Sequence, residues 1–252
     1  MSDYPRVTSV LGVLRKEGLE RWFKNNTAEF CDAESKKGKE IGTIIHKAIQ
    51  NNIEQNSVQI ETEYPNEVQN ALKSFFKFKK ENPELKLKKA EMSVISEKHG
   101  YLGTLDCIGS VGNKLVIIDW KTGTCNVGKV SKGGYSKEVD IPPTYPEHEY
   151  QVCAYVKAYN ETENKEVSEC KVLVLAKDKV SYNLLGIGSK KIDEIFENVF
   201  LPCFSIYKHQ LKEGLYDKWS PGSGGNTRQR DNGNSEKGGK HSSKSAGLPA
   251  SF

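Results

Sequence analysis

Two aspartates and one lysine, on neighbouring segments of the chain, are the strongest candidates for chemistry. Asp106 lies within the segment 103–109, and Asp119 and Lys121 follow the apolar run Leu115–Ile118. Alternate residues of a strand point to the same face, so Asp119 and Lys121 should share a face. Two carboxylates are typical ligands of a hard divalent cation, and the lysine adds one positive charge beside them.

This combination suits the hydrolysis of a phosphodiester. A bound cation polarises the phosphoryl oxygens and lowers the pKa of a water molecule, while a lysine can offset charge in the transition state. A plainer interpretation also fits the same residues. Asp119 would then end a strand and cap the following turn, and Lys121 would be solvated.

The periodicity of apolar residues predicts the elements that must position these side chains. Two short helices begin the chain, followed by a helix with an apolar stripe from Ile41 to Ile49 that carries His46 and a helix around Val68–Phe76. Three strands follow at 91–96, 103–110 and 114–121. A helix at 149–159, a hairpin of 171–176 with 180–185, and a helix at 192–211 complete the pattern. We expect an α/β fold with a central mixed β-sheet flanked by helices and a helical N-terminal segment.

The motifs resemble those of the PD-(D/E)XK nuclease superfamily, in its RecB-like branch. Asp106 is followed by Asp119-Trp120-Lys121, with Gly42-x-x-x-His46 and Glu91 before it and Gln151-x-x-x-Tyr155 after it. The runs Gly103–Ile108, Gly112–Thr122 and Gln151–Tyr155 are also similar to those of the mitochondrial genome maintenance exonuclease family with its phage and bacterial relatives. The resemblance spans Pro5 to Leu211 and implies a restriction-endonuclease-like core.

The resemblance also implies a role for each matching residue. His46, Asp106, Asp119 and the backbone carbonyl of Trp120 would hold Mg²⁺, for which Mn²⁺ could substitute. Lys121 would be the catalytic lysine, and Glu91 a supporting acid that opens the first strand. Gln151 and Tyr155 would brace the site and contact DNA. Alternatives remain open: His46 could be a hydrogen-bonded core residue, Glu91 a strand-edge charge, and Tyr155 part of a packed helix face.

Two lysine-rich segments could guide a nucleic-acid strand. The connection Thr122–His148 is long for a loop, and its Lys129, Lys132 and Lys137, with Tyr135 and Tyr145, offer phosphate contacts and stacking surfaces. A flexible insertion is the alternative. The lysines between Lys77 and Lys89 form the second segment, which could equally be a solvated face.

Composition sets the boundaries of the domain. After Trp219 the chain becomes a stretch of 33 residues, 14 of them Gly or Ser, which predicts a disordered tail at 220–252 and one nuclease domain at 1–219. The net charge of +4 divides into +3 for the tail and +1 for the domain. DNA binding by the domain must therefore depend on local lysines and a bound cation rather than on overall basicity.

Other motifs are missing from the sequence. The six cysteines contain no CxxC pair, and only Cys170 and Cys203 follow the Gln-Tyr motif, so we expect no iron–sulfur cluster. There is no P-loop, and we expect no use of ATP. The sequence has no apolar run that could span a membrane and no Arg- and Ser-rich presequence, which favours the cytoplasm of a bacterium or phage-infected cell over a mitochondrion.

These features together predict a metal-dependent DNA exonuclease that acts on single-stranded ends during DNA replication, recombination or repair. Proteins of replication or recombination are then possible partners. A structure-specific or recombination endonuclease of the same superfamily is one alternative. The other is a non-catalytic nucleic-acid-binding protein that retains the fold, although it would not need the whole set of site residues.

Overall fold

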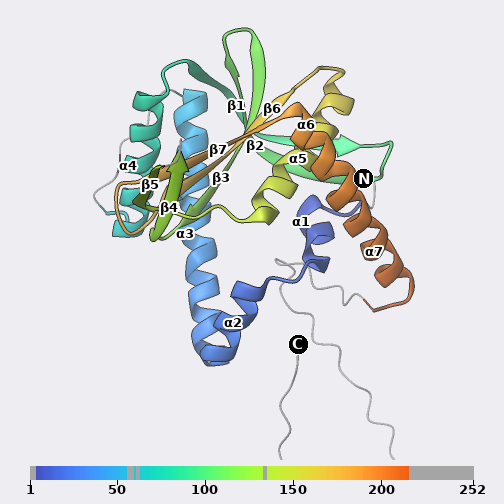
Figure 1. Cartoon of the computed structure of the whole chain (residues 1–252), viewed down its shortest axis with the longest axis horizontal. Coiled ribbons are helices and arrows are strands. Elements are labelled where there is room, and N and C mark those ends of the chain that lie inside the picture. Colours follow the sequence, from blue (N-terminus) through green and yellow to red (C-terminus); the bar gives the residue numbers. More distant parts are fainter. Residues whose placement is uncertain (1–3, 56–59, 61–62, 133–134, 216–252) are drawn as a thin grey trace, which may run out of the picture. The chain divides into compact units, whose positions relative to one another are not determined.

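The computed structural model describes residues 4–55, 60, 63–132 and 135–215 (Figure 1), and the predicted tail lies outside these residues. The helices are α1 (Val7–Val10), the 3₁₀ turn η1 (Leu11–Val13), α2 (Glu17–Asn25), α3 (Ala28–Gln55), α4 (Asn66–Glu81), α5 (Pro146–Glu163), α6 (Ser189–Ile195), the π turn η2 (Phe196–Phe200) and α7 (Leu201–Lys212). The strands are β1 (Leu85–Ser96), β2 (Tyr101–Val111), β3 (Lys114–Gly123), β4 (Asn126–Lys132), β5 (Tyr135–Ile141), β6 (Glu169–Ala176) and β7 (Tyr182–Gly188).

Five of the strands form one mixed sheet in the order β1-β2-β3-β6-β7. β3 and β6 are parallel, and the other neighbours are antiparallel. A parallel pair needs a crossover connection, which α5 supplies between β3 and β6. The apolar run of β3 is buried because this strand lies at the centre of the sheet with helices on both faces. The predicted α/β fold with a mixed sheet and a helical N-terminal segment is confirmed.

Two apolar clusters hold the helices against the sheet. On one face, Ile45 of α3 and Phe75 of α4 belong to a cluster with Ile118 of β3. On the other face, Val152 of α5 and Phe200 of η2 share a cluster with Ile117. The side chains of consecutive β3 residues thus point to opposite faces of the sheet and pack in different clusters, as the two-residue period of a strand requires.

The last helical segment contains a wide turn in place of an uninterrupted α-helix. The helix predicted at 192–211 is present, but residues Phe196–Phe200 form a π turn that ends two residues before Pro202. Proline has no N–H to donate, and its ring crowds the carbonyl group four residues earlier. A π turn is one of the ways in which a helix accommodates such a residue.

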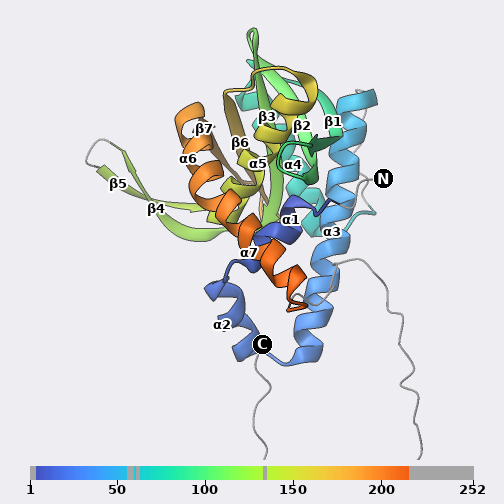
Figure 2. The ribbon, with the colours of Figure 1, turned by 90° about the vertical axis from the view of Figure 1, so that its right-hand side faces the viewer.

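Two expectations about the strands were wrong. The first strand begins at Leu85, so Glu91 lies in its middle and does not open it. The connection Thr122–His148 is not a structureless loop, because β4 and β5 pair along it from Asn126↔Ile141 to Lys132↔Tyr135. Figure 2 shows this hairpin extending beyond the main sheet.

Candidate active site

The β2–β3 pairing brings the two aspartates together. Cys107 of β2 pairs with Ile118 of β3, so Asp106 and Asp119 are the next residues along their strands. The backbone N–H of Trp120 donates a hydrogen bond of 2.8 Å to Oδ2 of Asp106. This bond fixes the Asp106 carboxylate at the point where β3 passes from apolar to charged residues.

Asp106 also belongs to a compact group of possible metal ligands with His46 and Glu91. One donor atom from each residue lies within 4.8 Å of the others. Nδ1 of His46 is 3.5 Å from Oδ1 of Asp106 and 3.6 Å from Oε1 of Glu91. The three side chains come from α3, β1 and β2, so the group forms only when the helix packs on the sheet.

Glu91 has a backbone conformation that is unusual for a residue in a strand. Its φ is +51°, in the left-handed region that side chains other than glycine rarely adopt. Such strain persists where surrounding structure imposes it, and it is common at functional sites. In β1 it accompanies an acidic side chain that faces His46.

Asp119 makes a second set of contacts, on the α5 side of β3. It is completely buried and forms a short ion pair with Lys121 through Oδ2. Its Oδ1 accepts a hydrogen bond of 3.3 Å from Nε2 of Gln151, which also donates to the hydroxyl of Tyr155 at 2.9 Å. The side chain of Lys121 is 23% exposed, so this residue is not a solvated strand-end lysine.

Charge and burial shift the pKa values of this group in a consistent way. Burial, followed by the charge of Asp119, raises the pKa of Asp106 to about 7. Burial lowers the pKa of His46, but the contact with Glu91 and the charge of Asp106 outweigh it and raise that pKa above its ordinary value. Burial likewise opposes the charge of Lys121, yet Asp119 and Asp106 raise the pKa of this ammonium group.

These residues fit a divalent cation. Two carboxylates and one imidazole nitrogen converge, and a bound cation would offset both causes of the raised pKa of Asp106, its burial first and the charge of Asp119 second. Oxygen-rich groups of this kind suit Mg²⁺ or Mn²⁺. Glu91, expected only as a supporting acid, lies within the group, whereas the contacts of Asp119 are with Lys121 and Gln151. The ligand role of the Trp120 carbonyl stays a prediction.

His148 is a residue of this region that the sequence argument did not include. It lies in the first turn of α5, where its Nδ1 accepts a hydrogen bond of 3.4 Å from the backbone N–H of Tyr145. Burial, followed by the charge of Lys121, lowers its pKa. The signal was available in the sequence, because His148, Gln151 and Tyr155 follow a spacing of three and then four residues along one helix face.

A groove lies beside the start of α5. It has a volume of about 830 Å³, and its walls include Trp22 of α2 and Tyr145 and Tyr150 at the start of α5. Lys16 and Glu147 face each other across it at 3.9 Å. Of the predicted DNA-binding lysines, Lys129 and Lys132 belong to β4 and Lys137 to β5, and their side chains lie outside the described part of the structure.

Comparison with known proteins gives matches at the level of three-dimensional structure. The chain is similar to a crystal structure of a proposed exonuclease from Eubacterium rectale, with a TM-score of 0.37 and 13% identity over 62% of this chain and 71% of that one. It is also similar to the crystal structure of SSO0001, with a TM-score of 0.26 and 14% identity over 63% and 71% of the two chains. Neither a protein-family model nor a curated protein matches the sequence. Among the described helices, none combines the length and apolar character of a membrane span.

Proposed function

We propose that this chain is a metal-dependent DNA exonuclease that hydrolyses phosphodiester bonds at single-stranded DNA ends during replication, recombination or repair. The observation that carries the proposal is the convergence of His46, Glu91 and Asp106 next to the buried Asp119–Lys121 pair. Structural α/β domains have no need for three acids, a histidine and a lysine at one point of the sheet, since burying such groups is costly.

His46, Glu91 and Asp106 would hold Mg²⁺ or Mn²⁺, and Asp119 would add a second buried carboxylate beside it. When bound, the cation polarises the phosphate and lowers the pKa of an attacking water. Lys121 keeps its proton at neutral pH despite its burial, because Asp119 and Asp106 raise its pKa, so its ammonium group can offset negative charge on the phosphate. Gln151 orients Asp119 by donating to Oδ1.

The groove beside α5 supports a single-stranded substrate. Trp22, Tyr145 and Tyr150 present aromatic surfaces, and unpaired bases stack on such side chains without regard to sequence. Tyr145 is 50% exposed, which leaves its ring accessible to a base. The α5 helix joins this groove to the candidate metal ligands, because Glu147 lines the groove and Gln151, one turn later, contacts Asp119.

The test is cleavage of end-labelled single-stranded, duplex and circular DNA with Mg²⁺, Mn²⁺ or EDTA. We expect shortening of linear single strands that requires the cation, and its loss in Asp119→Ala and Lys121→Ala. Cleavage that persists in both variants would contradict the site assignment. Efficient cutting of closed single-stranded circles would indicate an endonuclease, and binding without turnover would indicate a non-catalytic DNA-binding protein.

A further inference from the structure

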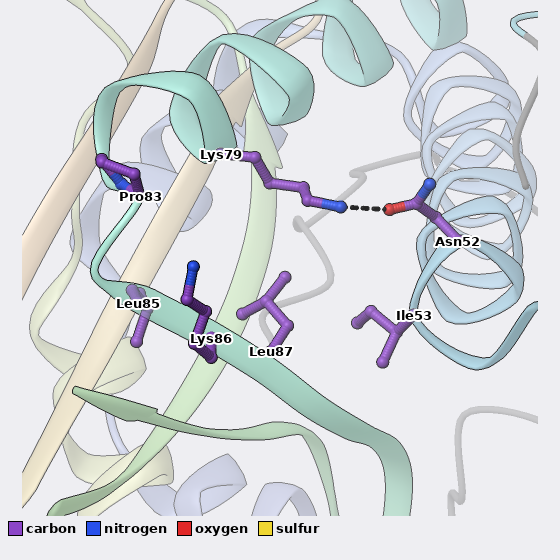
Figure 3. A pocket seen from close by; sticks show the side chains of 7 residues that line it. All are labelled: Asn52, Ile53, Lys79, Pro83, Leu85, Lys86 and Leu87. Carbon is purple, nitrogen blue, oxygen red and sulfur yellow. Dashed lines mark hydrogen bonds between the residues drawn. The ribbon is translucent and has the colours of Figure 1, made fainter. Parts of the chain in front are cut away.

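A separate, positively charged pocket lies between the end of α3, the end of α4 and the start of β1 (Figure 3). It has a volume of about 330 Å³. α3 contributes Asn52 and Ile53, α4 contributes Lys79, and the following turn and strand contribute Pro83 and Leu85–Leu87. None of the candidate metal ligands lines it.

The pocket carries two positive charges and no negative one among its described lining residues. Lys79 and Lys86 supply the charges, and the other lining side chains are apolar apart from the neutral amide of Asn52. Within the described part of the chain, neither lysine forms an ion pair with an acid, although many other lysines do. The pocket therefore favours an anionic ligand.

Asn52 orients one of the two cations in advance. Its Oδ1 accepts a hydrogen bond of 2.8 Å from Nζ of Lys79, as Figure 3 shows. Asn52 is 7% exposed, and Nζ also lies 5.7 Å from the ring centre of Phe75. An ammonium group has three N–H donors, so two remain for a ligand. A side chain that is ordered before binding loses less entropy when the ligand arrives.

The pocket and the candidate metal ligands lie along the same seam between α3 and β1. Ile53 follows His46 by seven residues on α3, which places it on the same helix face about 10 Å further along the axis. Leu87 precedes Glu91 by four residues on β1, a separation of at most about 13 Å, because the strand is irregular between Leu87 and Lys89 and at Glu91. Consecutive phosphates of a nucleic-acid strand are several ångströms apart, so this distance corresponds to a few nucleotides.

We infer that this pocket binds a backbone phosphate of the same nucleic-acid strand, a few nucleotides from the bond that is cut. Lys79 and Lys86 contact the phosphate oxygens, and Ile53 and Leu87 provide an apolar wall for the adjoining sugar. The inference rests on the proposed nuclease function, because it takes the ligand to be the substrate of that site. It adds an anchor that fixes the strand relative to the candidate metal ligands.

The experiment compares Lys79→Ala/Lys86→Ala with a matched control, Lys73→Ala/Lys190→Ala. The control removes the same charge from two exposed lysines, one in α4 and one in α6, that do not line the pocket. Binding of a labelled single-stranded oligonucleotide without terminal phosphates is measured in EDTA at several salt concentrations, on the full chain. Thermal unfolding checks that each variant is folded.

We expect the slope of log affinity against log salt to fall by about 0.7 for each phosphate contact that the pocket variant loses. The control should keep the slope of the unaltered protein. Asn52→Leu, which removes the acceptor for Lys79 but no charge, should weaken binding less than the double variant. Equal slopes and affinities in the pocket and control variants would overturn the inference.

Two further measurements are needed. Competition by inorganic phosphate distinguishes a free or terminal phosphate from an internal one, and a comparison of binding with cleavage distinguishes the pocket inference from the nuclease proposal. If inorganic phosphate displaces the oligonucleotide, and this displacement is lost in the pocket variant, the pocket takes a free or terminal phosphate, which overturns its assignment to an internal one. If binding depends on Lys79 and Lys86 but the unaltered protein cuts no DNA with Mg²⁺ or Mn²⁺, the nuclease proposal fails. The pocket is then still a binding site for a nucleic-acid phosphate. If the unaltered protein cuts DNA but the pocket variant binds it as well as the unaltered protein does, the phosphate-pocket inference fails and the nuclease proposal stands.

Discussion

Oδ2 of Asp106 accepts the backbone N–H of Trp120 at 2.8 Å, which leaves Oδ1 facing His46 at 3.5 Å. The backbone of one strand thus occupies one oxygen of the acid and directs the other toward the helix. An amide in place of the carboxylate could still accept the Trp120 N–H, so Asp106→Asn separates the charge of this residue from its structural role.

In metal-free buffer, Asp106→Asn should stabilise the protein above neutral pH. Burial and Asp119 raise the pKa of Asp106 to about 7, so the folded state holds this proton more tightly than the unfolded state. The unaltered protein therefore loses stability as pH rises from about 4 through 7, and His46, whose pKa is also raised, contributes in the same direction. Urea unfolding in EDTA from pH 5 to 8 measures the difference, expected to be a few kcal/mol at most. Parallel pH profiles for the two proteins would contradict it.

Divalent cations should reverse the order of stability of the unaltered protein and Asp106→Asn above neutral pH. A cation competes with the proton on Asp106, so Mn²⁺ should raise the melting temperature of the unaltered protein more at pH 8 than at pH 6. Asp106→Asn and His46→Ala should show a smaller rise at both pH values. Na⁺ at matched ionic strength is the control. An equal response in the variants would show that the cation binds elsewhere.

Replacing Lys121 with methionine should destabilise the fold by about 3 kcal/mol, because it leaves the buried Asp119 carboxylate without its ion-pair partner. The double variant Asp119→Asn/Lys121→Met should recover much of this loss, since it removes both charges. Chemical denaturation of the unaltered protein, Asp119→Asn, Lys121→Met and the double variant gives the coupling energy between the two side chains. Additive effects would mean that the ion pair contributes little to folding.

Gly103→Ala should disturb the site through a residue on another element. A Cβ at position 103 would lie 2.4 Å from Cε1 of Tyr155, whose hydroxyl accepts from Gln151. We expect a destabilisation of about 1 to 3 kcal/mol and a loss of DNA cleavage. Gly38→Ala in α3 is the matched control, because open space surrounds that position and alanine favours a helix by about 1 kcal/mol. Normal cleavage by Gly103→Ala would show that Tyr155 does not position the site.

Gln151→Ala should slow cleavage by about 10- to 100-fold with little change in stability, because Oδ1 of Asp119 loses its side-chain donor. Tyr155→Phe removes only the hydroxyl that accepts from Gln151, so its effect should be smaller. Turnover rates at saturating Mg²⁺, with unfolding measured in parallel, distinguish the two. A larger effect for Tyr155→Phe would assign the main role to the tyrosine.

Periodicity predicted the main sheet because its strands carry strong apolar patterns. The run Leu115–Ile118 indicated a central strand, and β3 lies third among five. The hairpin β4–β5 was missed because lysines and glycines within it show no apolar alternation. The first half of α3 was missed for a related reason: among its residues 28–40 only Cys31 is buried, so no apolar stripe marks a helix there.

The sequence proposed the members of the candidate site, but it could not give their arrangement. Motif spacing selected His46, Asp106, Asp119 and Lys121, and the structure brings all four to one region. Spacing could not show that Glu91 joins His46 and Asp106 in one group while Asp119 contacts Lys121 and Gln151, because this arrangement depends on how α3 packs on the sheet. The pocket at Lys79 and Lys86 also depends on packing between α3 and β1, which a linear pattern does not contain.

The β4–β5 hairpin leaves the domain and returns to it at almost the same place. Asn126 pairs with Ile141, the backbone N–H of Cys125 donates to Asp178 at 2.9 Å, and Nδ2 of Asn183 donates to the carbonyl of Pro142 at 3.1 Å. Because both stems of the hairpin are anchored to the β6–β7 turn region, its length can change without moving β3 or α5. Evolution can therefore alter this insertion, and with it the surface offered to a substrate, while the charged residues of β3 and α5 keep their places.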